Sequence, residues 1–85
     1  MLPYNNTTYF TGDMDNLTTI GLYIIEASSQ VTNIPANIAK GSWVLVLKHT
    51  VKYMFQILIP RDASKIFGRG MSDGSWGPWK SVTLA

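Results

Sequence analysis

The residues best suited to bind a ligand are two tryptophans near the end of the chain. The segment Trp76-Gly77-Pro78-Trp79 places two indoles around a rigid Gly-Pro bend. Exposed indoles offer flat apolar faces and an N–H donor, a chemistry that suits sugar rings. The same side chains could instead pack down and hold the last strand against a sheet. A small domain has little core, so we expect it to use such large side chains for packing.

Other polar residues do not form a catalytic pattern. Asp13 and Asp15 could act as paired carboxylates, but two acids in one short turn are better explained as the capping of a helical turn. His49 lies at an expected hairpin without a partner, which favours a solvated turn residue. Gly68-Arg69-Gly70 is not a phosphate loop, because no helix follows it. We therefore expect no enzyme, no metal site and no cofactor.

The composition points to self-association. The chain has 85 residues and no cysteine, so disulfides cannot stabilise its small core. Charged residues make up only 14% of the sequence, against roughly 25% in typical soluble domains. The seven basic residues are scattered, which argues against nucleic-acid binding. No run of apolar residues is long enough for membrane insertion. We expect another copy of the chain to cover part of its apolar surface.

The elements that must position these residues are mostly strands. Asp13 is a candidate N-cap, and Gly21 ends any helix that follows it. Asp73-Gly74 is a tight-turn signal, and Pro35 excludes a central strand from the loop Ala27–Lys40. Segments rich in β-branched and aromatic residues predict strands at Gly21–Glu26, Ser42–Lys48, Tyr53–Ile59 and Lys65–Met71, with His49–Lys52 as a hairpin connection and a bend and short last strand over Trp76–Val82.

The fold class that follows is mainly β. We expect a small antiparallel sheet or sandwich of four to five strands with one short helical turn near residues 13–17. Residues 1–12 are expected to form an extended lead-in that pairs along an edge, and residues 13–85 the β domain.

Two of the predicted strands have apolar residues on both faces. In the third strand, Tyr53 and Phe55 alternate with Met54 and Leu58, and the second strand behaves in the same way. A sheet with one solvated face would alternate apolar with polar residues. Two apolar faces need two partners, which we expect to be the core of the domain and a neighbouring chain. Trp43, in the middle of its strand, is expected in the core.

An ordered set of landmarks runs along residues 13–82. They are Asp13-x-Asp15-x-Leu17, Gly21-Leu22-Tyr23, Asn33-x-Pro35, the apolar strand Trp43–Leu47, Gln56-Ile57, Phe67-x-Arg69 and Trp76-x-x-Trp79. This order resembles the knob-type domain of phage tail fibres and R-type pyocin fibres. Such domains form part of trimeric fibres that engage the bacterial surface. The loop before the second strand is longer and more polar here than is usual in the family.

The resemblance implies a homotrimer in a phage tail fibre or tailspike, located in the virion and produced in the cytoplasm of the bacterial host. It implies host attachment through a bacterial surface glycan or lipopolysaccharide. The alternative is a structural module that assembles the fibre trimer without a ligand. A sugar site would combine an exposed aromatic face with polar loop residues. The candidates are Trp76, Trp79, Tyr53, Asn33, Asn37, Arg69 and Asp73.

Overall fold

The protein is a β-sheet domain with two short helical turns. In the computed structural model, which describes residues 8–84, the elements are β1 (Gly12–Asp13), η1 (Met14–Asn16), β2 (Gly21–Ile25), η2 (Ser28–Gln30), β3 (Val31–Thr32), β4 (Ser42–Thr50), β5 (Tyr53–Ile59), β6 (Lys65–Ser72), β7 (Ser75–Trp76) and β8 (Lys80–Thr83). This confirms the mainly β prediction and the helical turn near residues 13–17.

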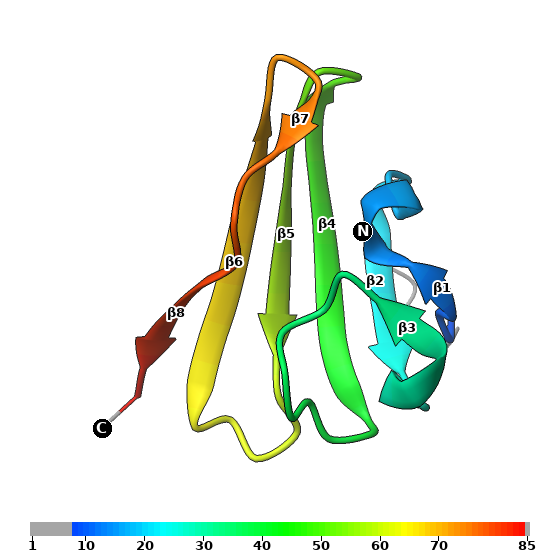
Figure 1. The fold of residues 1–85 in the computed structure, drawn as a ribbon, viewed down its shortest axis with the longest axis vertical. Helices are drawn as coiled ribbons and strands as arrows, with labels where there is room; N and C mark the ends of the chain where they lie inside the picture. Colours follow the sequence, from blue (N-terminus) through cyan, green and yellow to red (C-terminus); the bar gives the residue numbers. More distant parts are fainter. Residues whose placement is uncertain (1–7, 85) are drawn as a thin grey trace.

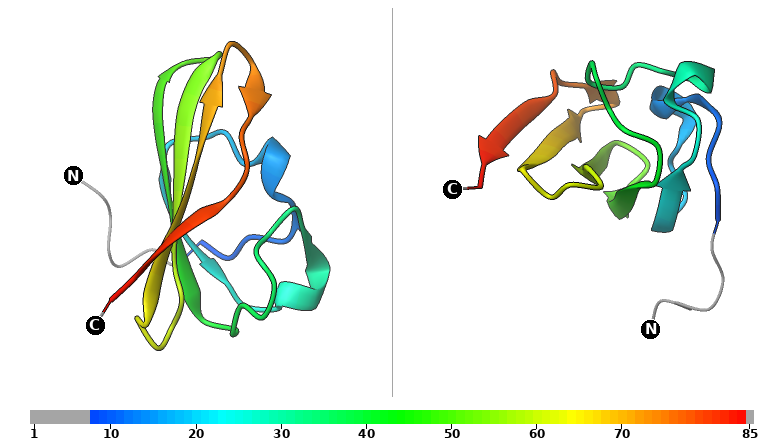
Figure 2. Two further views of the ribbon diagram at one scale, coloured as in Figure 1. Left: turned by 60° about the vertical axis from the view of Figure 1, so that its left-hand side comes forward. Right: turned by 90° about the horizontal axis from the view of Figure 1, so that it is seen from below.

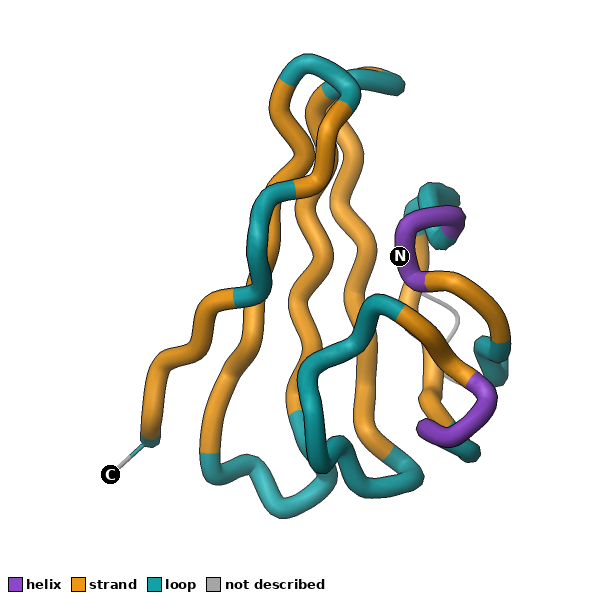
Figure 3. Tube along the Cα trace, in the orientation of Figure 1, coloured by secondary structure: helices purple, strands orange, loops and turns teal. Residues whose placement is uncertain are grey.

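One antiparallel sheet of six strands forms the body of the domain (Figure 1). Its strands lie in the order β2-β4-β5-β6, and β7 and β8 both pair with β6 at different points along its length. A separate parallel pair, β1 with β3, lies beside it. Figure 3 shows that the helical turns are confined to the segments around this small pair. The sheet therefore has one strand more than the predicted four to five.

Two tight hairpins meet at one end of the sheet. Asp73 and Gly74 both have positive φ, which is the geometry of a two-residue hairpin turn and suits Asp-Gly. The other turn is Val51–Lys52, and the N–H of Gly74 donates to the carbonyl of Lys52 at 3.1 Å. β4 continues to Thr50 across a register shift, so the connection between β4 and β5 is shorter than the predicted segment His49–Lys52.

The core lies on one face of the sheet only. Figure 2 shows the segments that carry η1, η2 and β3 on one side of it. They cover the inner face of the sheet, which carries Val44 and Val46 of β4, and Met54 and Leu58 of β5. The buried cluster is completed by residues of the covering segments and of β2, namely Met14, Leu17, Ile25, Val31 and Ile38.

Two details differ from the sequence expectations, and the position of the lead-in agrees with them. Trp43 is 38% exposed rather than buried, because it alternates with Val44 and so lies on the uncovered face. The expected loop Ala27–Lys40 contains η2 and the short β3. Beyond its first seven residues, which lie outside the described part of the chain, the expected lead-in runs beside β2: the N–H of Phe10 donates to Ile24, and that of Ile24 donates to Thr8.

Candidate functional site

The most concentrated group of polar side chains surrounds Arg69, in the middle of β6. Arg69 lies on the inner face of the sheet and is only 6% exposed. Its Nε donates to Oε1 of Gln56 on the neighbouring strand at 2.8 Å. Its Nη1 lies 2.8 Å from Oδ1 of Asp15, an ion pair without the angle of a hydrogen bond. Arginine stays charged in proteins, so its burial here depends on these partners.

Gln56 connects the sheet to the helical turn η1. It is fully buried on β5, and its Nε2 donates to the carbonyls of Met14 and Leu17 at 2.8 and 2.9 Å. The carbonyl of Met14 also accepts the N–H of Leu17 within the turn, while Leu17 is the C-cap, where backbone acceptors lack a partner within the helix. One amide side chain thus joins η1, β5 and Arg69 into a single network.

A second part of the network lies between η1 and the residue after β3. Asp13 caps η1 by accepting the N–H of Asp15 at 2.8 Å. Asn33 has φ of 57°, a backbone region that asparagine tolerates, and its Nδ2 donates to Oδ1 of Asp13 at 2.7 Å. The amide of Asn33, the N–H of Asp15 and the charge of Arg69 together lower the pKa of Asp13.

The two C-terminal tryptophans complete this network. The Arg69 guanidinium carbon lies 4.4 Å from the ring centre of Trp76 and 4.8 Å from that of Trp79, so it makes a cation–π contact with each. The Trp76 indole N–H donates to the carbonyl of Asp15, and that of Trp79 to the carbonyl of Asn33. Both indoles are half-buried, and they hold the segment between β7 and β8 against the covering loops.

The Arg69 network is organised to hold segments together. Its donors and acceptors are largely used within the network, and over residues 8–84 only Arg69 Nη2 and Asp15 Oδ1 are buried without a hydrogen bond. The same part of the chain contains no cluster of three or more metal-ligating side chains. It contains no helix of the length and apolarity needed to cross a membrane. The network joins four regions of the chain that lie up to 61 residues apart.

The second candidate site is the outer face of the sheet, opposite the core. Register places three apolar rows on it, which run across the strands as Leu22–Leu45–Ile57, Ile24–Trp43–Ile59 and Leu47–Phe55. Ile66 and Val82 extend the face to the β6–β8 edge. Many of these side chains are more than one-third exposed. Lys80 is the one charged side chain that the described strands add to this face, at its edge.

This face exposes many large apolar side chains close together. Seven of its side chains, Leu22, Trp43, Leu47, Tyr53, Phe55, Ile66 and Val82, are between 37% and 65% exposed. Contiguous apolar patches of roughly 300–600 Å² are the largest that typical monomers show, and such patches are usually interaction sites. The outer face is therefore the second candidate site, as a surface for contact with another chain.

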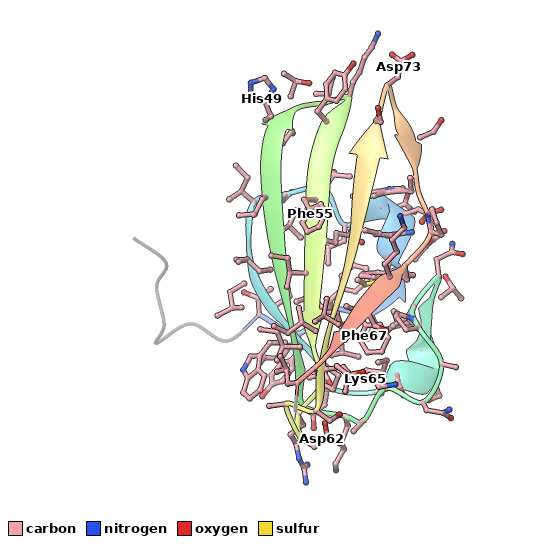
Figure 4. The ribbon with its side chains drawn as sticks, turned by 90° about the vertical axis from the view of Figure 1, so that its left-hand side faces the viewer. His49, Phe55, Asp62, Lys65, Phe67 and Asp73 are labelled. Atoms are coloured by element: carbon pink, nitrogen blue, oxygen red, sulfur yellow. The ribbon has the colours of Figure 1, made fainter. Side chains whose placement is uncertain are left out.

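The structure divides the seven residues predicted as a ligand site into two groups and one separate residue, Asn37. Trp76, Trp79, Arg69 and Asn33 come together in the Arg69 network. Tyr53 and Asp73 lie at the hairpin end, where Tyr53 is 47% exposed. Figure 4 shows His49 and Asp73 at this end and Asp62 and Lys65 at the opposite end. Asn37 is exposed in the loop before β4 and makes no side-chain hydrogen bond within residues 8–84.

Sequence reasoning missed the function of two landmark residues. Gln56 and Asp15 were recognised as motif positions, but neither was assigned a contact. The available signal was the polar Gln56 between Met54 and Leu58 on a strand face that is otherwise apolar. A polar side chain in such a position must find hydrogen-bond partners within the fold.

Comparison with solved structures identifies the fold. The domain superposes on the C-terminal residues 323–701 of the P. aeruginosa R1 pyocin fibre with a TM-score of 0.77 and 15% identity, over 92% of this chain and 21% of that one. It matches residues 323–691 of the R2 pyocin fibre with a TM-score of 0.78 and 16% identity, over 93% and 22%. An N-truncated R2-type pyocin tail fibre gives 0.77 and 16%, over 92% and 32%.

These matches confirm the fold that the resemblance implied. The chain spans about a fifth to a third of the length of the fibre chains it matches. No protein-family profile matches the sequence, and no curated protein does either.

Proposed function

We propose that the protein is a domain of a phage or pyocin-type tail fibre, and that it assembles the fibre by packing against other copies of itself. The observation that carries this proposal is the apolar outer face, which the described segments leave uncovered. The fold supports it, since the matched structures are fibres. Location in the virion follows from the same proposal.

The Arg69 network favours assembly over ligand binding at the tryptophans. One surface of each indole contacts the Arg69 guanidinium, and each indole N–H is used by a backbone carbonyl. A sugar platform needs these surfaces and donors to be free. The tryptophans instead stabilise the inner side of the domain, which leaves the outer face to make contacts between copies.

Oligomeric state tests the assembly proposal directly. Sedimentation of the 85-residue chain at micromolar concentration should give about three times the monomer mass of 9.5 kDa. Leu47→Lys places a charge on the outer face and should give a folded monomer, since burial of an unpaired charge opposes association. Val51→Lys is the control, because Val51 is also an exposed apolar residue but lies in the hairpin turn, and this variant should remain a trimer. A monomeric parent chain would overturn the proposal.

Attachment to a bacterial surface glycan or lipopolysaccharide is the second candidate, and the hairpin end supports it. There Tyr53, whose ring is exposed, begins β5 directly after the Val51–Lys52 turn. The backbone of this turn contacts that of the Asp73–Gly74 turn. An aromatic surface near polar turn residues has the composition of a sugar site. Three copies in one fibre would raise a weak affinity through avidity.

A glycan array separates this candidate from assembly alone. Binding should fall on Tyr53→Ala and persist on Tyr9→Ala, a matched control because Tyr9 is also exposed but lies beside β2. Absence of binding by a trimeric parent chain would remove the attachment proposal and leave assembly in place.

A further inference from the structure

The outer face is not uniform, because two glycines of β6 create a groove in it. Gly68 and Gly70 alternate with Phe67 and Arg69, so their missing side chains would lie on the outer face. The ring of Phe55 leans over both: a Cβ at Gly68 would lie 3.0 Å from it, and a Cβ at Gly70 3.4 Å. The groove lies between this ring and the β8 edge.

The groove is apolar and of the right size for a large side chain. Its volume is about 480 Å³, within the range of roughly 300–1,000 Å³ that binding pockets occupy. Phe55 and Ile57 line one side, while Pro78, Lys80 and Val82 line the other. Lys80 supplies a positive charge at the rim, and no acidic residue lines the groove.

The opposite edge of the same face has the complementary shape and charge. Trp43 of β4 is 38% exposed there, with Ile24 of β2 beside it. Glu26 follows β2 directly, in a bend at the end of the strand, and is exposed. One edge thus presents a bulky indole and an acid, and the other presents a hollow and a lysine.

We infer that the glycine groove receives Trp43 of a second copy of this chain, with Glu26 of that copy beside Lys80. The inference rests on the proposed assembly function and specifies its geometry. We place one such contact between each copy and the next, which is a heterologous arrangement, and a ring of such contacts can close on itself. A trimer joined in this way buries the groove of every copy.

The absence of cysteine from the chain makes this geometry testable by crosslinking. Glu26→Cys and Lys80→Cys each introduce one thiol at an exposed position. The two variants are mixed after unfolding and refolding together, then treated with a bismaleimide about 10 Å long, the spacing of packed sheets. The expected product is a crosslinked pair of one chain of each kind. A mixture of Glu26→Cys with Val51→Cys is the control and should give little of it.

Each variant by itself reports the alternative arrangement. Strong crosslinking of Glu26→Cys to itself or of Lys80→Cys to itself, without the mixed pair, would place each edge against its own copy and would overturn the inference. An oligomer in which no pair crosslinks would also overturn it, although the assembly function would stand. A monomeric parent chain would instead remove the assembly function itself.

The strength of association gives a second measurement, made on variants of Trp43 and of the glycine groove. Trp43→Ala should weaken association at least about tenfold, as expected for an aromatic side chain seated in a pocket. Gly70→Leu should do the same by filling the groove, while circular dichroism verifies that the sheet persists. Val51→Ala, which shortens another exposed apolar side chain outside the groove, should leave association unchanged. Equal association of all three variants and the parent would exclude Trp43 from the groove.

Discussion

Replacing Gln56 by leucine tests whether the Arg69 network holds the domain together. The change keeps the size of the side chain and removes every polar contact it makes. Arg69 Nε and the carbonyl of Leu17 then lose the partners they have in the network, while the carbonyl of Met14 still accepts the N–H of Leu17.

The expected loss of stability follows from these contacts. Each of the two buried groups left without a partner costs about 1–3 kcal/mol. The additional apolar burial of leucine returns about 1 kcal/mol. The net loss is then roughly 1–5 kcal/mol, a large share of the roughly 4–13 kcal/mol expected for a domain of this length.

Urea unfolding followed by tryptophan fluorescence measures this loss. All samples need the same protein concentration, because self-association contributes to the measured stability. The matched control is Gln30→Leu, the other glutamine of the chain, which is exposed in η2 and should change stability by no more than about 0.5 kcal/mol. If Gln56→Leu costs less than about 1 kcal/mol, or no more than its control, Gln56 does not hold η1 to the sheet.

Two further predictions concern the charged members of the network. Arg69→Lys keeps the charge but loses the planar contact with both indoles, so we expect about 2 kcal/mol less stability and an altered near-ultraviolet circular dichroism spectrum. The control is Arg61→Lys, at an exposed turn, which should show neither change. Equal behaviour of the two variants would contradict the prediction. Because the pKa of Asp13 is lowered from 3.8 in the folded state, its contribution is complete above that value and is lost as the pH falls through the lower folded pKa. Thermal unfolding below pH 4 should therefore show a shallower loss of stability for Asp13→Asn than for the parent chain, whereas identical slopes would show that the contacts of Asp13 do not matter.

The strands and the tight turn could be predicted because their signals are local. Tyr53–Ile59 consists of residues that favour strands and is ended by Pro60, and the structure places β5 at these residues. Asp73-Gly74 adopts the positive φ values that its residue types allow. The capping of η1 by Asp13 also depends only on residues two positions apart. Such features are set by backbone preferences that a short segment carries with it.

The position of the covering segments and the choice of inner face depended on tertiary structure. β4 and β5 are apolar on both faces, so their sequences could not show that Val44 would be buried and Trp43 exposed. That choice was made by segments distant in sequence, which pack on one face only. Asn33 and Asp13 are 20 residues apart, and Trp76 and Asp15 are 61 apart. Contacts at such separations depend on how the whole chain folds back on itself, which no local pattern encodes.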